Sequence, residues 1–299
     1  MDASQFPTLD PELAPILAFL PDMREAMNDI EGARAMLTSV VPPGAAAGED
    51  LLDVTDVVES GVPLRVYRPR TGTTKGVLYL HGGGFCLGDL EMEHGGAVQI
   101  ANEVDAVVVS VDYRLAPEHP YPAGLDDCMV GLRYLSTLVD TIAVHGQSAG
   151  GGLGAATVLR ARDEGGPTIA FQSLGIPELD HRLETPSMQA FDGTPLWARP
   201  QAIKSWEYYL GGQPADGYAS PSIMADLSGL PPAHLTVMEL DPLRDEGITY
   251  ALRMLQAGVS VELHAYPGTF HGSSLVQDAA VSKRQAQDLI GALRRGLSG

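Results

Sequence analysis

The stretch "IAVHGQSAGGGLGAATVLRARD", residues 142–163, decides the fold. The apolar run before Gly146 is typical of a buried strand, and the residues after Ser148 recur at helical spacing. Residues 146–150 thus have the form G-x-S-x-G between a strand and a helix, which is the pattern of a nucleophile elbow. The hydroxyl of Ser148 then lies at a helix N-terminus, where the helix dipole favours negative charge. We interpret Ser148 as a catalytic nucleophile, and the competing interpretation is a glycine-rich packing turn.

Strand and helix patterns alternate on both sides of this turn. They predict an α/β fold with a mostly parallel central sheet flanked by helices, because continuous apolar runs are typical of strands covered on both faces. Two alternating segments around Gly61 predict an antiparallel strand pair at the start of the sheet. Residues 11–40 have a helical pattern, and residues 40–50 are expected to be a linker. The expected strands are 76–80, 106–111, 141–145, 169–174, 234–239 and 261–266, and the expected helices are about 92–103, 124–139, 149–163, 244–257 and 277–296.

A glycine triplet follows the strand expected at 76–80, in His81-Gly82-Gly83-Gly84. A serine that attacks a carbonyl creates an oxyanion, which preorganised N–H donors must stabilise. Glycine amides can approach such a group closely because no side chain shields them. We therefore predict an oxyanion hole formed by the amides of Gly83 and Gly84 with that of Ala149. A phosphate-binding loop is the alternative, but the Lys-Ser/Thr pair of that motif is missing.

A nucleophilic serine also needs a base and a carboxylate that orients the base. His271 is the candidate base, because it lies on a glycine-flanked loop after the last expected strand. Asp241 is the candidate carboxylate, because it directly follows the apolar strand at 234–239. The order Ser148, Asp241, His271 is that of the α/β-hydrolase fold. The rival acids are Glu239, Asp245 and Glu246, of which the last two are expected to begin the next helix.

Five motifs together resemble the hormone-sensitive lipase-like family of α/β-hydrolase esterases, also called bacterial family IV: "HGGGFCLGD", "VDYRLAPEHPYPA", "GQSAGGGL", "DPLRDEG" and "FHG". The resemblance implies a helical cap made of residues 1–45 and of an insertion at 180–215. The catalytic domain would then comprise residues 46–179 and 216–299. One position departs from the family pattern, since Gln147 stands where the family usually has Asp or Thr.

The function expected from this resemblance is that of a serine carboxylesterase that needs neither cofactor nor metal. Its substrates would be short- to medium-chain esters, hydrolysed through an acyl-enzyme. The alternatives are an amidase or deacetylase with the same triad, and a non-catalytic small-molecule receptor of the same fold. The receptor branch of the family lacks the histidine base, whereas His271 is present here. Aromatic residues of the insertion are expected to line the substrate pocket: Phe191, Trp197, Trp206 and Tyr209.

Composition restricts the partners. The chain has 19 Lys and Arg residues against 38 Asp and Glu residues, a formal charge of −19, which repels nucleic acid and anionic membranes. No apolar run is long enough to span a membrane, and the N-terminus lacks the pattern of a signal peptide. The two cysteines have no metal-binding spacing and fit a reducing compartment. We therefore expect a cytoplasmic protein with a small-molecule ester substrate, and the family resemblance suggests a homodimer.

Overall fold

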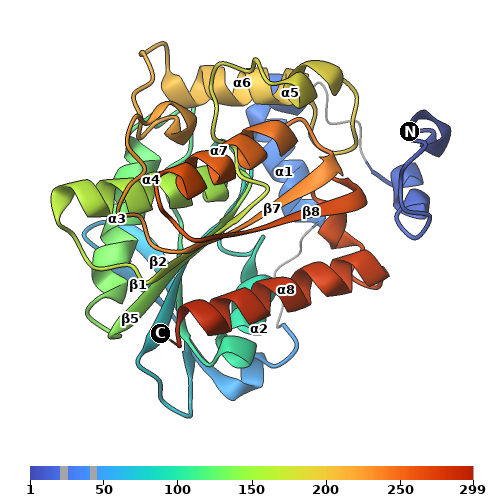
Figure 1. Cartoon of the computed structure of the whole chain (residues 1–299). Coiled ribbons are helices and arrows are strands. Elements are labelled where there is room, and N and C mark those ends of the chain that lie inside the picture. The colour runs from blue at the N-terminus through green and yellow to red at the C-terminus, as the bar shows by residue number, and fades with distance from the viewer. Residues whose placement is uncertain (21–25, 41–45, 299) are drawn as a thin grey trace.

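The computed structural model describes residues 1–20, 26–40 and 46–298. An eight-stranded sheet in the order β1-β2-β4-β3-β5-β6-β7-β8 forms its centre (Figure 1). Strand β2 is antiparallel to both of its neighbours, and every other pair is parallel. The strands are β1 (Leu52–Glu59), β2 (Val62–Pro69), β3 (Lys75–Leu80), β4 (Val107–Val111), β5 (Thr141–Gln147), β6 (Phe171–Gly175), β7 (Ala233–Leu240) and β8 (Val261–Phe270).

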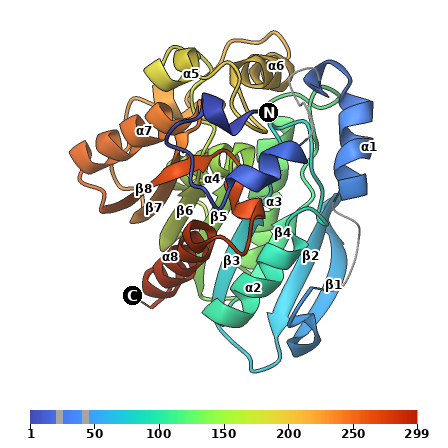
Figure 2. The same cartoon turned by 90° about the vertical axis from the view of Figure 1, so that its right-hand side faces the viewer.

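Helices cover both faces of this sheet. On one face, α3 (Ala123–Leu135), α4 (Ala149–Glu164) and α7 (Arg244–Gln256) enclose the largest apolar cluster. On the other face lie α2 (His94–Val104) and α8 (Ala280–Gly296), which enclose a second cluster (Figure 2). The expected α/β architecture, the antiparallel pair and each expected strand and helix of this region are confirmed to within a few residues.

The sheet brings distant parts of the chain together at one edge. The parallel strands β3, β5, β7 and β8 all end at the same edge of the sheet. The glycine loop follows β3, Ser148 follows β5, Asp241 follows β7 and His271 follows β8. A parallel sheet therefore places all four predicted elements of the site side by side, as expected for ligand sites in α/β folds.

The N-terminal segment differs from the expectation of helical structure over residues 11–40. Residues Ala14–Ala18 and Ala26–Asn28 form short 3₁₀ helices, and only α1 (Ile30–Val40) is an α-helix. Pro15 has no amide hydrogen to donate, which disfavours an α-helix that continues through this position. Residues 41–45 of the linker expected at 40–50 lie outside the described residues, and Glu49–Leu51 forms a 3₁₀ helix.

The insertion after β6 is helical and carries no strand among its described residues. It contains α5 (Pro186–Ala190) and α6 (Arg199–Leu210), which Figure 1 shows beside each other at the top of the molecule. The Tyr208 hydroxyl on α6 donates to the carbonyl of Met27, 3.1 Å away, which links the insertion to the N-terminal segment. These two parts of the chain therefore touch each other across the edge where the strands end.

Candidate active site

Ser148 occupies the sharp turn between β5 and α4. Its backbone has φ +56° and ψ −123°, a conformation that residues with a Cβ adopt rarely and at a cost in free energy. Three backbone hydrogen bonds hold it there. The Ser148 amide donates to Gly175 O at 2.8 Å, while its carbonyl accepts from the amides of Gly152 and Glu178, both at 3.0 Å. The end of β6 thus fixes the turn from one side.

The two glycines of the pentapeptide allow the close approach that this turn requires. A Cβ at Gly146 would lie 2.1 Å from Gly150 O, and a Cβ at Gly150 would lie 2.1 Å from Leu80 O. Both distances are far below van der Waals contact with backbone atoms, so no other residue fits at either position without a shift of the main chain. This geometry is that of a nucleophile elbow and not of an ordinary packing turn.

The three predicted catalytic side chains lie in one hydrogen-bonded row. His271 Nε2 lies 2.9 Å from Ser148 Oγ, and His271 Nδ1 lies 2.7 Å from Asp241 Oδ2. All three residues are buried. Asp241 also accepts the amide hydrogen of Leu243 at 2.9 Å, which fixes its carboxylate. With Nδ1 donating to Asp241, Nε2 is free to accept the serine proton, so the row can activate the hydroxyl.

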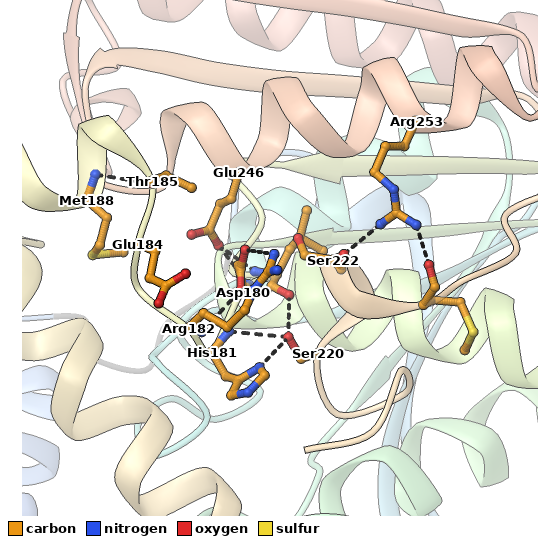
Figure 3. A network of polar contacts seen from close by, with 12 residues as sticks. Asp180, His181, Arg182, Glu184, Thr185, Met188, Ser220, Ser222, Glu246 and Arg253 are labelled. Atoms are coloured by element: carbon orange, nitrogen blue, oxygen red, sulfur yellow. Dashed lines mark hydrogen bonds and ion pairs between the residues drawn. The ribbon is translucent and has the colours of Figure 1, made fainter. Parts of the chain in front are cut away.

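The rival carboxylates have other partners. Glu239 accepts from the amide of Gly268 at 2.7 Å. Asp245 accepts from the amide of Ser187 at 2.8 Å, and Glu246 accepts from the amide of Leu179 at 2.6 Å. Figure 3 shows Glu246 pointing from α7 towards the loop at Asp180. The last two acids do begin α7, as expected, but both also bind backbone of the inserted segment.

The glycine loop lies directly beside the serine. A Cβ on Gly82 would lie 3.4 Å from the Ser148 Cβ, and Gly83 and Gly84 have φ values of +117° and +57°, which favour glycine. Among the described residues no acceptor binds the amides of Gly83 or Gly84. Ala149 is the first residue of α4, so its amide has no acceptor within the helix. Three unpaired N–H groups next to the serine fit the predicted oxyanion hole.

Burial keeps His81, the residue before the glycine loop, neutral. His81 stacks on Tyr113 with ring centroids 4.1 Å apart, and its Nδ1 lies 2.8 Å from Gly82 O. Desolvation lowers the pKa of His81 to about 4, so it is uncharged at neutral pH and serves the loop structure. Within the described part of the chain no group of His, Cys, Asp and Glu could hold a metal ion.

The four aromatic residues expected to line the pocket lie in different places. Trp197 is nearest the triad, since its ring centroid lies 5.9 Å from that of His271 and its indole abuts Gly84. Trp206 and Tyr209 lie behind the glycine loop, with centroids 5.3 and 4.0 Å from that of Phe85. Phe191 packs in the apolar cluster that contains the N-terminal segment. The pocket-lining role of all four stays a prediction.

The sequence patterns did not single out three residues that support this site. Glu178 donates its amide hydrogen to Ser148 O, and Ser205 Oγ donates to Gly84 O at 2.9 Å. Arg34 of α1 donates to Cys86 O at 2.9 Å and pairs with Glu118 at 2.8 Å. The side chain of Glu118 is half exposed and binds the N-terminal segment through Arg34. No spacing rule links these residues to the triad, because each contact joins distant segments.

Gln147 is the last residue of β5, directly before the serine. It pairs with Gly175 of β6, and its half-buried side chain lies against that glycine, where a Cβ would approach it to 3.2 Å. The amide side chain thus occupies the space between the ends of two strands, outside the row of triad hydrogen bonds.

Comparison with known proteins agrees with this geometry. A family model described as the alpha/beta hydrolase fold matches residues 77–275. Carboxylesterase NlhH of Mycobacterium tuberculosis is 39% identical over 284 residues, which cover 89% of each chain. A solved structure of a bacterial heroin esterase is 48% identical, with a TM-score of 0.92, and the match covers 98% of this chain and 99% of that one. Esterase LipW from Mycobacterium marinum is 35% identical with a TM-score of 0.81, covering 98% and 97%.

Proposed function

Since this chain belongs to the hormone-sensitive lipase-like family of α/β hydrolases and is a serine carboxylesterase, we propose that Ser148, His271 and Asp241 are its catalytic triad. The observation that carries this proposal is the unbroken row of hydrogen bonds from Ser148 Oγ through His271 to Asp241. Each member also follows a different strand of one sheet, so the fold holds their spacing.

Acylation begins when Ser148 Oγ attacks the ester carbonyl and His271 Nε2 takes the hydroxyl proton. Asp241 stabilises the imidazolium that forms, and the amides of Gly83, Gly84 and Ala149 bind the oxyanion. When the tetrahedral intermediate collapses, the C–O bond to the alcohol breaks and His271 gives its proton to the leaving oxygen. An acyl ester on Ser148 remains.

Deacylation repeats these steps with water. His271 takes a proton from the water while its oxygen attacks the acyl carbon, and the same three amides bind the second oxyanion. Collapse breaks the bond to Ser148 Oγ, which regains its proton from His271. The products are one carboxylic acid and one alcohol per turnover, and every step uses side chains and amides of this chain alone. An amidase or deacetylase would follow the same course with an amine as the leaving group.

We propose that residues 1–45 and 180–215 form a cap over this site, with residues 46–179 and 216–299 as the catalytic domain. Three observations support the cap. Tyr208 of the insertion binds Met27 of the N-terminal segment. Arg34 binds the carbonyl of Cys86, two residues after the oxyanion glycines. Trp197 reaches the triad histidine. Such a roof restricts the acyl group, which favours short- to medium-chain esters.

The surface suggests a second copy of the chain as a partner. Strand β8 lies at one edge of the sheet, and the N-terminal segment contacts its end, where the Asp10 amide donates to Gly268 O at 2.9 Å. Leu263 on β8 and Leu252 and Leu255 on α7 are exposed, the last two to 52%. We propose a homodimer that joins these edges, and light scattering of wild type and Leu263→Lys measures whether a dimer exists and depends on this strand.

The proposed location is the cytoplasm. Cys86 and Cys128 are both buried and unpaired, which fits a reducing compartment. In the described part of the chain no helix has the length and apolar character needed to cross a membrane. Fluorescence microscopy of the tagged full chain, with cell fractionation as a second measurement, tests this location.

The experiment that tests the proposed activity combines a substrate panel with active-site labelling. We expect p-nitrophenyl esters of short acids to be hydrolysed by the wild type and not by Ser148→Ala. A fluorophosphonate should modify Ser148, which peptide mass spectrometry identifies. Matched ester and amide substrates separate an esterase from an amidase. Labelling at another residue, or wild-type turnover by Ser148→Ala, would refute the triad.

A further inference from the structure

Glu178 is a fully buried acid in direct contact with the nucleophile turn. It follows Pro177 after the end of β6, and its amide hydrogen binds Ser148 O at 3.0 Å. The side chain is 0% exposed, and its carboxyl group lies next to the hydroxyl of Ser205 on α6. Ser205 in turn donates to Gly84 O, so Glu178 lies close to both the nucleophile turn and the glycine loop.

The surroundings of this carboxyl group disfavour a negative charge. Among the described residues neither carboxyl oxygen has a hydrogen-bond partner, and Glu178 forms no ion pair. The titratable groups that face it are Cys86 on the glycine loop, Tyr209 on α6, Asp241 after β7 and Glu246 on α7. None of these groups is a cation. A buried carboxyl group that has neither a cation nor a bound hydrogen-bond donor favours its protonated form. Burial accordingly raises the pKa of Glu178 to about 8.

Ser205 connects this acid to the oxyanion loop. Its hydroxyl is fully buried and donates to Gly84 O at 2.9 Å. A hydroxyl has one hydrogen to donate, so the Ser205 oxygen can still accept a hydrogen from another group. A protonated Glu178 can supply that hydrogen. The direction of donation then runs from Glu178 to Ser205 and from Ser205 to the carbonyl of Gly84.

We propose that Glu178 is a positioning residue that works in its protonated form and holds the oxyanion loop in place through Ser205. This inference rests on the proposed function, because Gly84 matters here as an oxyanion donor. An ionised Glu178 can only accept hydrogen bonds, so it takes the Ser205 hydrogen away from Gly84 O. It also places a negative charge behind the amides that stabilise the oxyanion. Turnover is therefore full below the pKa of Glu178 and falls as the pH rises through it.

Glu178→Gln tests this inference, because the glutamine amide has nearly the same shape, can donate to Ser205 and cannot ionise. The measurement is kcat for p-nitrophenyl acetate from pH 6 to 10, with the rate of Ser148→Ala subtracted. We expect the wild type to lose most of its kcat with a midpoint near pH 8. At pH 7 the kcat of Glu178→Gln should be at most a few-fold below that of the wild type. Its kcat should show no fall with rising pH in this range.

Glu93→Gln is the matched control. Glu93 is another acid whose pKa is raised by burial, but it accepts from the Tyr79 hydroxyl at 2.8 Å, on the opposite face of the sheet. The kcat of this variant should fall at high pH as it does in the wild type. Infrared difference spectra between pH 6 and 10 provide a direct readout. One component of the carbonyl band of protonated carboxylic acids should disappear with the same midpoint as kcat, and the spectrum of Glu178→Gln should lack that component.

Ser205→Ala tests the hydrogen bond from Ser205 to the carbonyl of Gly84. We expect kcat to fall several-fold with little change in KM, because the loop and not the substrate contacts are altered. A change in KM alone would overturn the inference, as would an alkaline fall that persists in Glu178→Gln or a wild-type kcat that is flat to pH 10. Fluorophosphonate labelling distinguishes a failure of this inference about Glu178 from a failure of the proposed catalytic triad. An unlabelled Ser148 in the wild type refutes the proposed function as well, whereas a labelled Ser148 with a persistent alkaline fall refutes this inference alone.

Discussion

His271 Nδ1 lies 2.7 Å from Asp241 Oδ2, although the two residues follow different strands and are 30 positions apart. This bond selects the tautomer in which Nε2 accepts the serine proton. Asp241→Asn offers an amide in place of the carboxylate and disturbs both the tautomer and the imidazolium. We expect kcat to fall by about 10⁴-fold, as for the corresponding change in other serine hydrolases.

Asp245→Asn is the matched control for this variant, since Asp245 is a rival acid from the same segment of the chain. Its carboxylate binds the Ser187 amide and pairs with Arg244, so its loss affects α5 and not the triad. We expect less than a ten-fold change in kcat. Steady-state kinetics of both variants, with circular dichroism to verify folding, gives the ranking, and the reverse order would show that the catalytic acid was misassigned.

The strained backbone of Ser148 predicts a stability effect that is separate from catalysis. A residue with a Cβ is strained at φ +56° and ψ −123°, and such backbone strain costs about 1–3 kcal/mol. Ser148→Gly removes the Cβ and adds up to about 1 kcal/mol of chain entropy to the unfolded state. Both Ser148→Gly and Ser148→Ala should be inactive, but the glycine variant should have the higher Tm. Calorimetry of the pair measures this difference, and a lower Tm for the glycine variant would mean that the strain in the turn is smaller than the entropic cost of the glycine.

Gln147 predicts a change in pH dependence. Gln147→Asp adds a negative charge beside the triad, which favours the imidazolium form of His271. Because catalysis needs neutral His271, the acid limb of kcat/KM should move to higher pH while the enzyme stays active. Gln147→Asn adds no charge, so the acid limb of its kcat/KM profile should lie at the same pH as that of the wild type. A complete loss of activity in Gln147→Asp would instead indicate a catalytic role for the glutamine.

Two histidines buried in the sheet predict a loss of stability in acid. His145 on β5 and His234 on β7 flank Ser173 on β6, and desolvation lowers the pKa of each to about 4. Unfolding restores a pKa of about 6.5, so the unfolded chain binds more protons between pH 6.5 and 4. Stability should therefore be full above pH 6.5 and should fall as the pH drops, by on the order of 2 kcal/mol per histidine at pH 5.

Urea titrations at pH 7 and pH 5 measure this effect. His145→Gln removes one of the buried titrating groups, and its stability should depend less on pH than that of the wild type. His119→Gln is the control, because His119 is exposed. Its loss should leave the change in stability between pH 7 and pH 5 as it is in the wild type. A wild-type stability that does not change from pH 7 to 5 would contradict the prediction.

The sheet and the arrangement of the triad could be predicted from the sequence because both follow local rules. Strands covered on two faces give continuous apolar runs, and parallel strands bring their carboxyl ends to one edge. Ser148, Asp241 and His271 of the proposed triad each follow an expected strand within five residues, so a correct strand assignment places them near each other. The glycines of the elbow are likewise required by local backbone geometry.

The supporting contacts could not be predicted in this way. Glu178 and Ser205 belong to segments of different structure, and only the folded chain shows that they meet behind Gly84. Arg34 acts through carbonyl oxygens, which carry no side-chain signature in the sequence. Within the helix expected at 11–40, residues 14–18 form a short 3₁₀ helix for another reason, because apolar spacing alone does not account for Pro15.

The last prediction concerns the length of the acyl group, which Trp197 should limit. Its indole packs on Gly84 and lies beside His271, so it occupies the space next to the reacting carbonyl. Each methylene buried in front of this wall should stabilise the transition state by about 0.8 kcal/mol, and longer chains should then lose activity. We expect kcat/KM for p-nitrophenyl esters to rise from acetate to a short- or medium-chain optimum and then to fall. Trp197→Ala should move the optimum to longer chains, whereas Trp206→Phe, behind Phe85, should leave it in place. A rate on emulsified long-chain triglycerides that rises above their solubility limit would contradict a closed acyl pocket and indicate a lipase instead.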